Sequence, residues 1–573
     1  MCPDTDPQLI LSFRIGLLGF ATGAIIRDDN VAAGEEGTGN YGLSVPVVQL
    51  LTHTDYRCSG LRDQRTAMEW LHHHIGEFGG DSSNITLIGS GSGAADIVAH
   101  LLSKHNASTS STNPRLFSRC IIQSPIFEPI LPSVSSAGWA LSRMMSALGV
   151  SSSIEKFRKV EVEKILAMGL GQTLRVVDDG VWFRKGWGEW FTPTSSSSSF
   201  QHAPLQPIII GDTTSDSLLW SNPISLWTSS GVVRRLKAIC QSLSKTSNVL
   251  RAYDIGSNTP DDEIMERVLE LVDDARVGWP TEIVAQAVRK EHSSIQDDGQ
   301  AGKVWRYVFD QEGPARGVPH YAADLMYLFD VKPASLASSS SGDECKSTLG
   351  SWDYTGPYEV DEDEQEEKEK AVASCAISVG SMSLEAALAA AAEAAAAGQV
   401  YGAPRIDPYA LCSSIASTSG TGTPQPSGQH HQTLVDDADW LISTVDEYAY
   451  ARVRDMMQQK WLAFAYGESP WTPWETPLAS SSSNESIHHQ DHRHHHHHQH
   501  AHHHHSHSHP SKSEKVFVFG PEGETGERSS AIFEGRRRRH MWSEVLEPLG
   551  WALVQKFGVE LSRGPALGAD RAR

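Results

Sequence analysis

Cysteine is scarce in this chain, and its few copies follow no recognisable spacing. The seven cysteines among 573 residues are odd in number, scattered, and never arranged as CxxC. This distribution predicts neither a disulfide framework nor a zinc cluster. It fits a reducing compartment, so we expect a cytoplasmic protein.

The sequence also lacks an uninterrupted hydrophobic run of membrane-spanning length. The apolar stretch near its start, Leu9 to Ile26, contains Arg14 and several glycines, and Asp4 and Asp6 stand where a signal peptide carries positive charge. The sequence therefore predicts neither a signal peptide nor a transmembrane span.

Positive charge is in deficit as well. The 48 basic residues face 70 acidic ones, which gives a formal charge of -22. General binding of nucleic acid or of anionic membranes needs a broad positive field, so nucleic-acid partners are excluded. Hydrophobic residues (39%) and aromatics (8%) suffice for a sizeable core. No pattern of fixed geometry predicts a cofactor or a metal centre.

The composition divides the chain into five segments. Residues 1–331 alternate short β-rich runs with helical patterns, which is typical of a mostly parallel sheet covered by helices. Residues 332–432 form a low-complexity insertion of serine runs, an acidic stretch and an alanine tract, and such a segment cannot bury a core. Helical patterning returns over 436–475, a Ser/His-rich tract covers 480–514, and 515–573 predict a terminal strand and helix.

Two tracts can be interpreted either as functional or as solvent-exposed segments without a specific function. The histidine run at 494–505 could bind a transition metal, although we favour a solvated tract without fixed geometry. The basic quartet Arg536 to Arg539 could be a nuclear signal, although a charged helix face is the simpler interpretation. If these tracts and the acidic stretch were the working parts, the chain would be an interaction protein with the core as its scaffold.

Several separate blocks carry a family resemblance. They are Phe13 to Phe20 (FRIGLLGF), Gly39 to Leu43 (GNYGL), Asp63 to Arg65 (DQR) and Phe78 to Gly89 (FGGDSSNITLIG). With these blocks the chain resembles the type-B carboxylesterase (cholinesterase-like) family of α/β-hydrolases. The resemblance implies an α/β-hydrolase fold with a central, mostly parallel sheet. The residue pattern itself predicts strands at Ile85 to Ile88 and in the later CIIQ and PIIIG runs.

The family's nucleophile elbow, G-x-S-x-G, is altered in this chain. It reads GSGSG from Gly89 to Gly93, so Gly91 occupies the nucleophile position and has no side chain to donate. Glycine adopts positive φ without penalty, so we expect the turn to survive while the chemistry is lost. The same form looks like that of the neuroligins, which are non-enzymatic members of the superfamily.

The resemblance also suggests the other members of a triad. His320, in GVPHYAADLMYLF, stands where the family places its catalytic histidine, and a structural histidine is the alternative. Asp216, after the PIIIG strand, stands at the acid position, with Asp212 as runner-up and a solvated loop aspartate as the alternative. We expect the His320 ring near Gly91, with Asp216 or Asp212 within hydrogen-bonding reach.

Ser90 and Ser92 flank the altered position and are the remaining candidates for a nucleophile. A shift of one residue moves the Cα by ~3.8 Å and redirects the hydroxyl. The leading hypothesis is therefore a carboxylesterase-like protein with impaired or absent ester hydrolysis, which retains a pocket for a small ester-like ligand or a protein partner. The alternative is an active carboxylic-ester hydrolase that uses Ser90 or Ser92 with His320 and Asp216.

Two further features of the sequence affect this interpretation. The family's HGGG-like oxyanion loop precedes the strand equivalent to Ile10 to Phe13, where this chain has only a few residues, so we expect a sheet truncated at its N-terminal edge. Residues 44–60 interrupt a matching block and are suspected to be a spurious insertion. Residues Gly89 to Ala94 also fit G-x-G-x-x-G/A, but no acidic residue follows at the spacing that a dinucleotide site needs.

Overall fold

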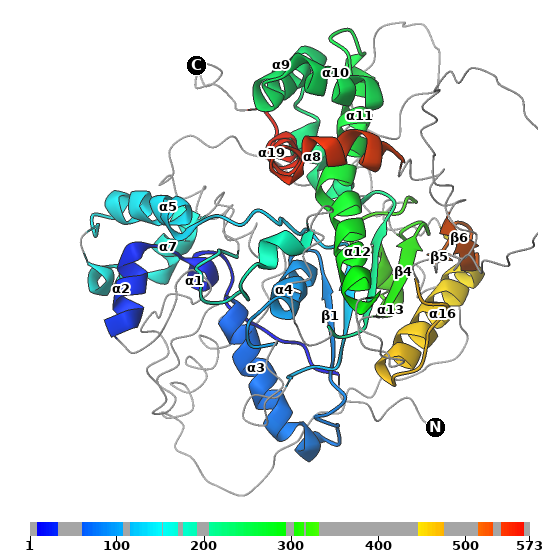
Figure 1. Cartoon of the computed structure of the whole chain (residues 1–573), viewed down its shortest axis with the longest axis horizontal. Coiled ribbons are helices and arrows are strands. Elements are labelled where there is room, and N and C mark those ends of the chain that lie inside the picture. Colours follow the sequence, from blue (N-terminus) through cyan, green and yellow to red (C-terminus); the bar gives the residue numbers. More distant parts are fainter. Residues whose placement is uncertain are drawn as a thin grey trace, which may run out of the picture. The chain divides into compact units, whose positions relative to one another are not determined.

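The protein folds around one open sheet with helices on both sides (Figure 1). The computed structural model describes residues 8–32, 60–106, 115–151, 153–169, 176–191, 205–293, 303–314, 317–331, 445–474, 514–530 and 540–565. All of them belong to one compact unit. Residues 44–59, the insertion at 332–432, the Ser/His-rich tract up to residue 513 and the Arg536 to Arg539 quartet lie outside the described residues.

The described sheet has six strands in the order β1-β2-β3-β4-β5-β6. The first five run parallel, and β6 pairs antiparallel with β5 as a hairpin. The bounds of the strands are β1 Thr86–Ser90, β2 Arg119–Gln123, β3 Ile208–Thr213, β4 Val304–Phe309, β5 Lys515–Phe519 and β6 Thr525–Ser529. The predicted fold class, a mostly parallel sheet with covering helices, is confirmed.

The central strands β2 to β4 are buried on both faces, as strands inside a parallel sheet must be. Alternate residues point to opposite faces, so Ile122 and Ile210 join one core cluster while Ile121 and Ile209 join the other. This burial on both sides explains the apolar runs Cys120 to Ile122 in β2 and Ile208 to Ile210 in β3. The sequence lacks the alternation of polar and apolar residues that a one-sided sheet shows.

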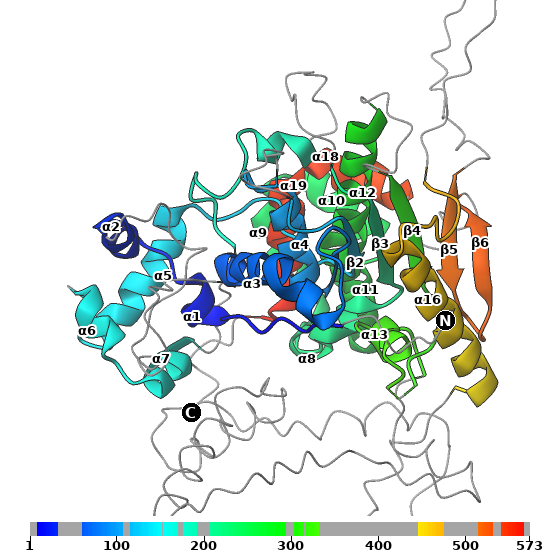
Figure 2. The ribbon, with the colours of Figure 1, turned by 90° about the horizontal axis from the view of Figure 1, so that it is seen from below.

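Two helices cover the first face and two cover the second. On the first face lie α4 (Ser92–Leu101), which packs on β1 and β2, and α12 (Trp279–Ser293), which packs on β3 and β4. On the second face lie α13 (Ala323–Leu328) and α16 (Glu447–Ala465) (Figure 2). The Asp446 side chain caps α16 by accepting hydrogen bonds from the amides of Tyr448 and Ala449.

The remaining helical segments surround this sandwich. They are α1 Gly16–Phe20, α2 Ala24–Ala32, α3 Gly60–His74, η3 Ile75–Phe78, α5 Val134–Ala147, α6 Ile154–Arg158, α7 Val162–Gly169, η4 Trp187–Phe191, η5 Asp216–Trp220, α8 Ser221–Ile224, α9 Ser229–Cys240, α10 Leu243–Ala252, α11 Asp261–Asp273, η6 Asp274–Gly278, η9 Trp542–Leu546, α18 Glu547–Leu549 and α19 Trp551–Ser562. Among the helices that the structure describes, none has both the length and the apolar character needed to cross a membrane.

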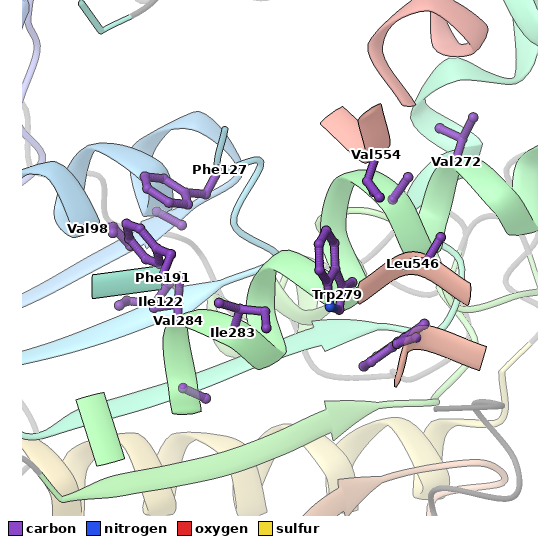
Figure 3. Close-up of a cluster of buried hydrophobic side chains, with 14 of the residues drawn as sticks. Val98, Ile122, Phe127, Phe191, Val272, Trp279, Ile283, Val284, Leu546 and Val554 are labelled. Atoms are coloured by element: carbon purple, nitrogen blue, oxygen red, sulfur yellow. The ribbon is translucent and has the colours of Figure 1, made fainter. Parts of the chain in front are cut away.

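The C-terminal helices complete the first core cluster although they are distant in sequence. The rings of Trp279 and Trp551 stack with centroids 4.1 Å apart, and Leu546 and Val554 lie in the same cluster (Figure 3). The Trp227 indole donates to the carbonyl oxygen of Leu561 at 2.8 Å. Residues 540–565 are therefore an integral part of the hydrolase-like domain.

The prediction of a strand at the start of the chain is wrong. Ile10 to Phe13 form neither strand nor helix, and Ile10 is 95% exposed. In the described part of the chain this segment docks on α3 instead of on β1, because the amide and the guanidinium of Arg14 both donate to the Asp63 carboxylate. A strand needs a paired neighbour for its backbone groups, and this ion pair directs the segment elsewhere.

Candidate functional site

The altered elbow has the geometry of a sharp strand-to-helix turn. Gly91 lies between β1 and α4 with φ 58° and ψ -115°. Its amide donates to the carbonyl oxygen of Gln123 at 3.0 Å, and its own carbonyl oxygen accepts from the amides of Ala95 and Ile126, both at 3.1 Å. Residues with a side chain rarely adopt this positive φ, so the turn favours glycine at this position.

The flanking glycine Gly89 has a different reason to be there. A Cβ at Gly89 would lie 2.7 Å from the carbonyl carbon of Gly93, in the first turn of α4. The missing side chain allows the helix to cross directly over the end of β1. Gly89 thus allows close packing of α4 on β1, whereas Gly91 allows the backbone conformation of the turn.

The two serines beside Gly91 point to different surroundings. Ser92 is the first residue of α4 and is exposed. Ser90 is the last residue of β1, and its hydroxyl is buried beside Tyr321. Neither serine occupies the centre of the turn, which is Gly91.

The structure places Tyr321 at the elbow, and sequence reasoning missed this residue. A Cβ at Gly91 would overlap the Tyr321 hydroxyl oxygen and would lie 2.9 Å from the ring carbon Cζ. Burial raises the pKa of the Tyr321 phenol, and the neighbouring Ser90 hydroxyl opposes part of that rise. Adjacency to His320 in the sequence was the available signal, but no motif marks a tyrosine at this position.

His320 precedes Tyr321 on the loop between β4 and α13. Its Nδ1 donates to the carbonyl oxygen of Tyr321 at 2.9 Å, since a carbonyl oxygen can only accept. The opposite edge of the imidazole, with Nε2, faces Gly313 so closely that a Cβ there would overlap it. The structure thus brings this loop to the elbow through Tyr321, while the imidazole hydrogen-bonds within its own loop.

Asp216, the candidate acid, begins η5 directly after β3 and is completely buried. One carboxylate oxygen accepts from the Thr213 hydroxyl at 2.8 Å and the other accepts from the Thr213 amide at 3.0 Å. Burial, reinforced by the nearby carboxylate of Asp212, raises the pKa of Asp216. Both carboxylate oxygens are therefore engaged by the strand end that the carboxylate follows.

The runner-up acid, Asp212, lies on β3 and is also buried. Its carboxylate lies 3.9 Å from the Arg306 guanidinium on β4, and that guanidinium lies 3.6 Å from the Glu282 carboxylate on α12. A buried cation placed between two carboxylates offsets their desolvation. Asp212 thus belongs to a buried ion group that links β3, β4 and α12.

A third buried acid, Asp324 on α13, was not identified from the sequence. Its Oδ2 accepts from the Gln123 amide at 2.8 Å and from the Tyr307 hydroxyl at 3.0 Å, and burial raises its pKa. We call Asp212, Asp216 and Asp324 the carboxylate cluster, because Asp212 and Asp324 both raise the pKa of Asp216 by charge repulsion. A polar residue inside the apolar ADLMYLF run was the available signal.

No group of three or more His, Cys, Asp or Glu side chains described in the structure is arranged to hold a metal ion. A cavity of about 490 Å³ lies at the amino ends of β1 to β3, at the opposite end of the strands from the elbow. Arg115, Ser118, Arg119 and Pro207 are among the residues that line it.

Comparisons with known proteins bear on the fold and the family. Lipase 3 of Yarrowia lipolytica is 22% identical over 330 residues, which cover 56% of this chain and 55% of the lipase. The inactive carboxylesterase-like protein VdtD of Byssochlamys spectabilis is 44% identical over 64 residues, 11% of this chain and 10% of that protein. The chain thus spans about half the length of the lipase and a smaller share of VdtD.

A solved structure of a thermophilic pNB esterase aligns with a TM-score of 0.46 and 14% identity, covering 91% of this chain and 78% of the esterase. The sequence model of the carboxylesterase family matches residues 58–348, which is half of the chain. That match contains the elbow, β1 to β4 and the His320 loop. The chain therefore belongs to the carboxylesterase family.

Proposed function

We propose that this chain is a carboxylesterase-family protein that binds a small ester-like ligand or a protein partner and does not hydrolyse esters. The observation that carries the proposal is Gly91, which occupies the turn where the family places its nucleophile. Ester cleavage on this fold requires a hydroxyl at that turn, a histidine to accept its proton and a carboxylate to orient the imidazole. The first of these groups is missing.

The surroundings of the other two groups support the same proposal. His320 donates to a backbone carbonyl oxygen, and Asp216 accepts two hydrogen bonds from Thr213. Nδ1 is the imidazole atom that an orienting carboxylate would engage, so these hydrogen bonds favour a non-hydrolytic protein. The similar protein VdtD is described as an inactive carboxylesterase-like protein, which supports the proposal.

The test uses the purified full chain, short-acyl p-nitrophenyl esters and a fluorophosphonate probe. We expect ester turnover equal to that of a His320→Ala variant, because the imidazole has no hydroxyl to activate. Loss of a triad member costs on the order of a million-fold in turnover, so residual activity should not depend on His320. We also expect no covalent labelling.

The alternative is an active hydrolase that uses Ser90 or Ser92 with His320 and Asp216, and Ser92 is exposed enough for a probe to reach. Labelling of either serine that disappears in His320→Ala would overturn the proposal and establish this hydrolase. Labelling that persists in His320→Ala would indicate a chemically reactive surface serine, and it would leave the non-hydrolytic proposal standing.

A further inference from the structure

The space beside Gly91 is filled by another residue. A Cβ at Gly91 would overlap the Tyr321 hydroxyl oxygen, and it would lie 2.9 Å from Cζ and 3.1 Å from Cε2 of the same ring. Real Cβ atoms essentially never approach another heavy atom closer than 3.0 Å. All three of the nearest heavy atoms belong to Tyr321, so a side chain at residue 91 would collide with the end of this phenol.

Gln123 ties the elbow and the tyrosine loop to each other. Its carbonyl oxygen accepts from the Gly91 amide at 3.0 Å, and its side-chain amide donates to Asp324 at 2.8 Å. Asp324 lies three residues after Tyr321 and accepts a second hydrogen bond from Tyr307. The distance between the elbow and the tyrosine loop is therefore set by buried hydrogen bonds, which cost free energy to break.

The backbone next to Tyr321 is fixed as well. Ala322 adopts φ 64°, a conformation that non-glycine residues rarely take, and α13 begins immediately after it. The carbonyl oxygen of Tyr321 accepts from His320, and the Ala323 amide donates to the carbonyl oxygen of His320 at 2.9 Å. Tyr321 is thus held from both sides with its ring directed at Gly91.

We propose that Tyr321 is a built-in plug, whose hydroxyl occupies the space of the missing nucleophile side chain and closes the elbow to an ester carbonyl. The elbow then lacks a nucleophile and is also blocked by Tyr321. A Gly91→Ser substitution alone would place the serine side chain against the phenol. The inference rests on the proposed function only in taking Gly91 as the nucleophile position.

The phenol is not itself a substitute nucleophile. Burial keeps it protonated, and an aromatic hydroxyl needs a base to remove its proton before it can attack. The imidazole beside it donates its Nδ1 proton to the Tyr321 carbonyl oxygen, and its Nε2 faces Gly313 instead of the phenol oxygen. Tyr321 therefore acts by filling space.

The experiment is a double-mutant cycle on the full chain, read as melting temperature. We expect Gly91→Ala to lower the melting temperature by several degrees, through positive-φ strain and through the collision with Tyr321. In a Tyr321→Ala background the collision is absent, so about half or more of that loss should vanish. Tyr321→Phe removes the nearest atom but keeps Cζ, and it should relieve an intermediate share.

Gly79 provides a control for the specificity of the coupling. It also has positive φ, 83°, but an added Cβ would meet nothing within 4 Å. Its ψ is 4° against -115° at Gly91, so the two glycines differ in strain, but the cost of Gly79→Ala should be the same with tyrosine or alanine at position 321. If Gly91→Ala alone does not fold, recovery of folded protein in Gly91→Ala/Tyr321→Ala supports the plug.

Equal losses for Gly91→Ala in both backgrounds would overturn the proposal, and so would a failure of Tyr321→Ala to recover an unfolded Gly91→Ala variant. These outcomes are separate from those that decide the proposed function. Probe labelling at Ser90 or Ser92 that is lost in His320→Ala would overturn the non-hydrolytic proposal without altering the coupling between Gly91 and Tyr321. Absence of coupling between Gly91 and Tyr321 would overturn the proposal that Tyr321 is a plug, and it would not affect the labelling result.

Discussion

The elbow and the carboxylate cluster lie at the same end of the sheet, yet the elbow is defined by its backbone and the cluster by its side chains. At the elbow the backbone forms a sharp turn, with φ 58° at Gly91, and the residue at its centre has no side chain. In the carboxylate cluster the ionisable side chains are present, and two of them accept short hydrogen bonds from Thr213, Gln123 and Tyr307.

The difference shows that a retained acid is weak evidence for retained catalysis. Asp324 connects β2, β4 and α13 through Gln123 and Tyr307, and Asp212 contributes to the ion group around Arg306. Removing such a residue leaves buried donors or charges without partners, whatever reaction the site performs. These contacts give Asp212 and Asp324 a structural role that does not depend on any reaction.

The largest effect is expected when the cation beside the cluster is removed. Arg306→Met should lower the free energy of unfolding by about 3–5 kcal/mol, because Asp212 and Glu282 would remain buried without their shared guanidinium. Chemical denaturation measures the loss. Arg454→Met is the control, since Arg454 pairs with Asp330 on the surface and should cost less than about 1 kcal/mol. Similar losses in the two variants would contradict the structural role of the cluster.

A smaller effect is expected inside the cluster itself. Asp324→Ala should cost about 1–3 kcal/mol more than Asp324→Asn, because alanine leaves the Gln123 amide and the Tyr307 hydroxyl without an acceptor. Asparagine keeps one acceptor oxygen and nearly the same volume. The comparison is made by denaturation at one pH. Equal stability of the two variants would mean that the hydrogen bonds to Asp324 contribute little.

The third prediction concerns pH. Burial and the neighbouring carboxylates raise the pKa of Asp216 above the ordinary value of 3.8 for this side chain, so the folded state binds its proton more tightly than the unfolded state does. Stability from this group is fully present below about pH 4 and is lost as pH rises through the folded pKa. Asp216→Asn, which cannot ionise, should therefore gain stability relative to the unmodified protein as pH rises from about 4 toward neutrality.

Asp96 serves as the reference for this titration because it is a buried carboxyl outside the cluster. Burial raises its pKa to about 7, against a partial lowering by its hydrogen bond to Gln64. Asp96→Asn should change the pH profile between about pH 4 and 7 in the same direction. If the unmodified protein instead gained stability over this range relative to both asparagine variants, the inferred direction of the pKa shifts would be wrong.

Part of this architecture is readable from the sequence, for identifiable physical reasons. The runs CIIQ and PIIIG predict β2 and β3 because strands buried on both faces must be almost wholly apolar. Gly89 and Gly91 predict the turn, because few other residues tolerate its packing and its φ. Asp324 and Tyr321 escaped notice because their roles depend on Gln123 and Gly91, some 200 residues earlier in the chain, and one sequence does not show which distant residues meet.

The smallest effect is expected for the serines that flank the elbow. Ser92→Ala removes an exposed hydroxyl and should change the free energy of unfolding by less than about 0.5 kcal/mol. Ser90→Ala removes a hydroxyl buried beside Tyr321 and should cost more than Ser92→Ala, although less than Asp324→Ala. Neither change should alter the background rate of p-nitrophenyl ester hydrolysis, because neither hydroxyl stands at the centre of the turn. A large drop in that rate for one serine, reproduced by His320→Ala, would identify the serine as a working nucleophile, and the contrast between the elbow and the carboxylate cluster would then no longer hold.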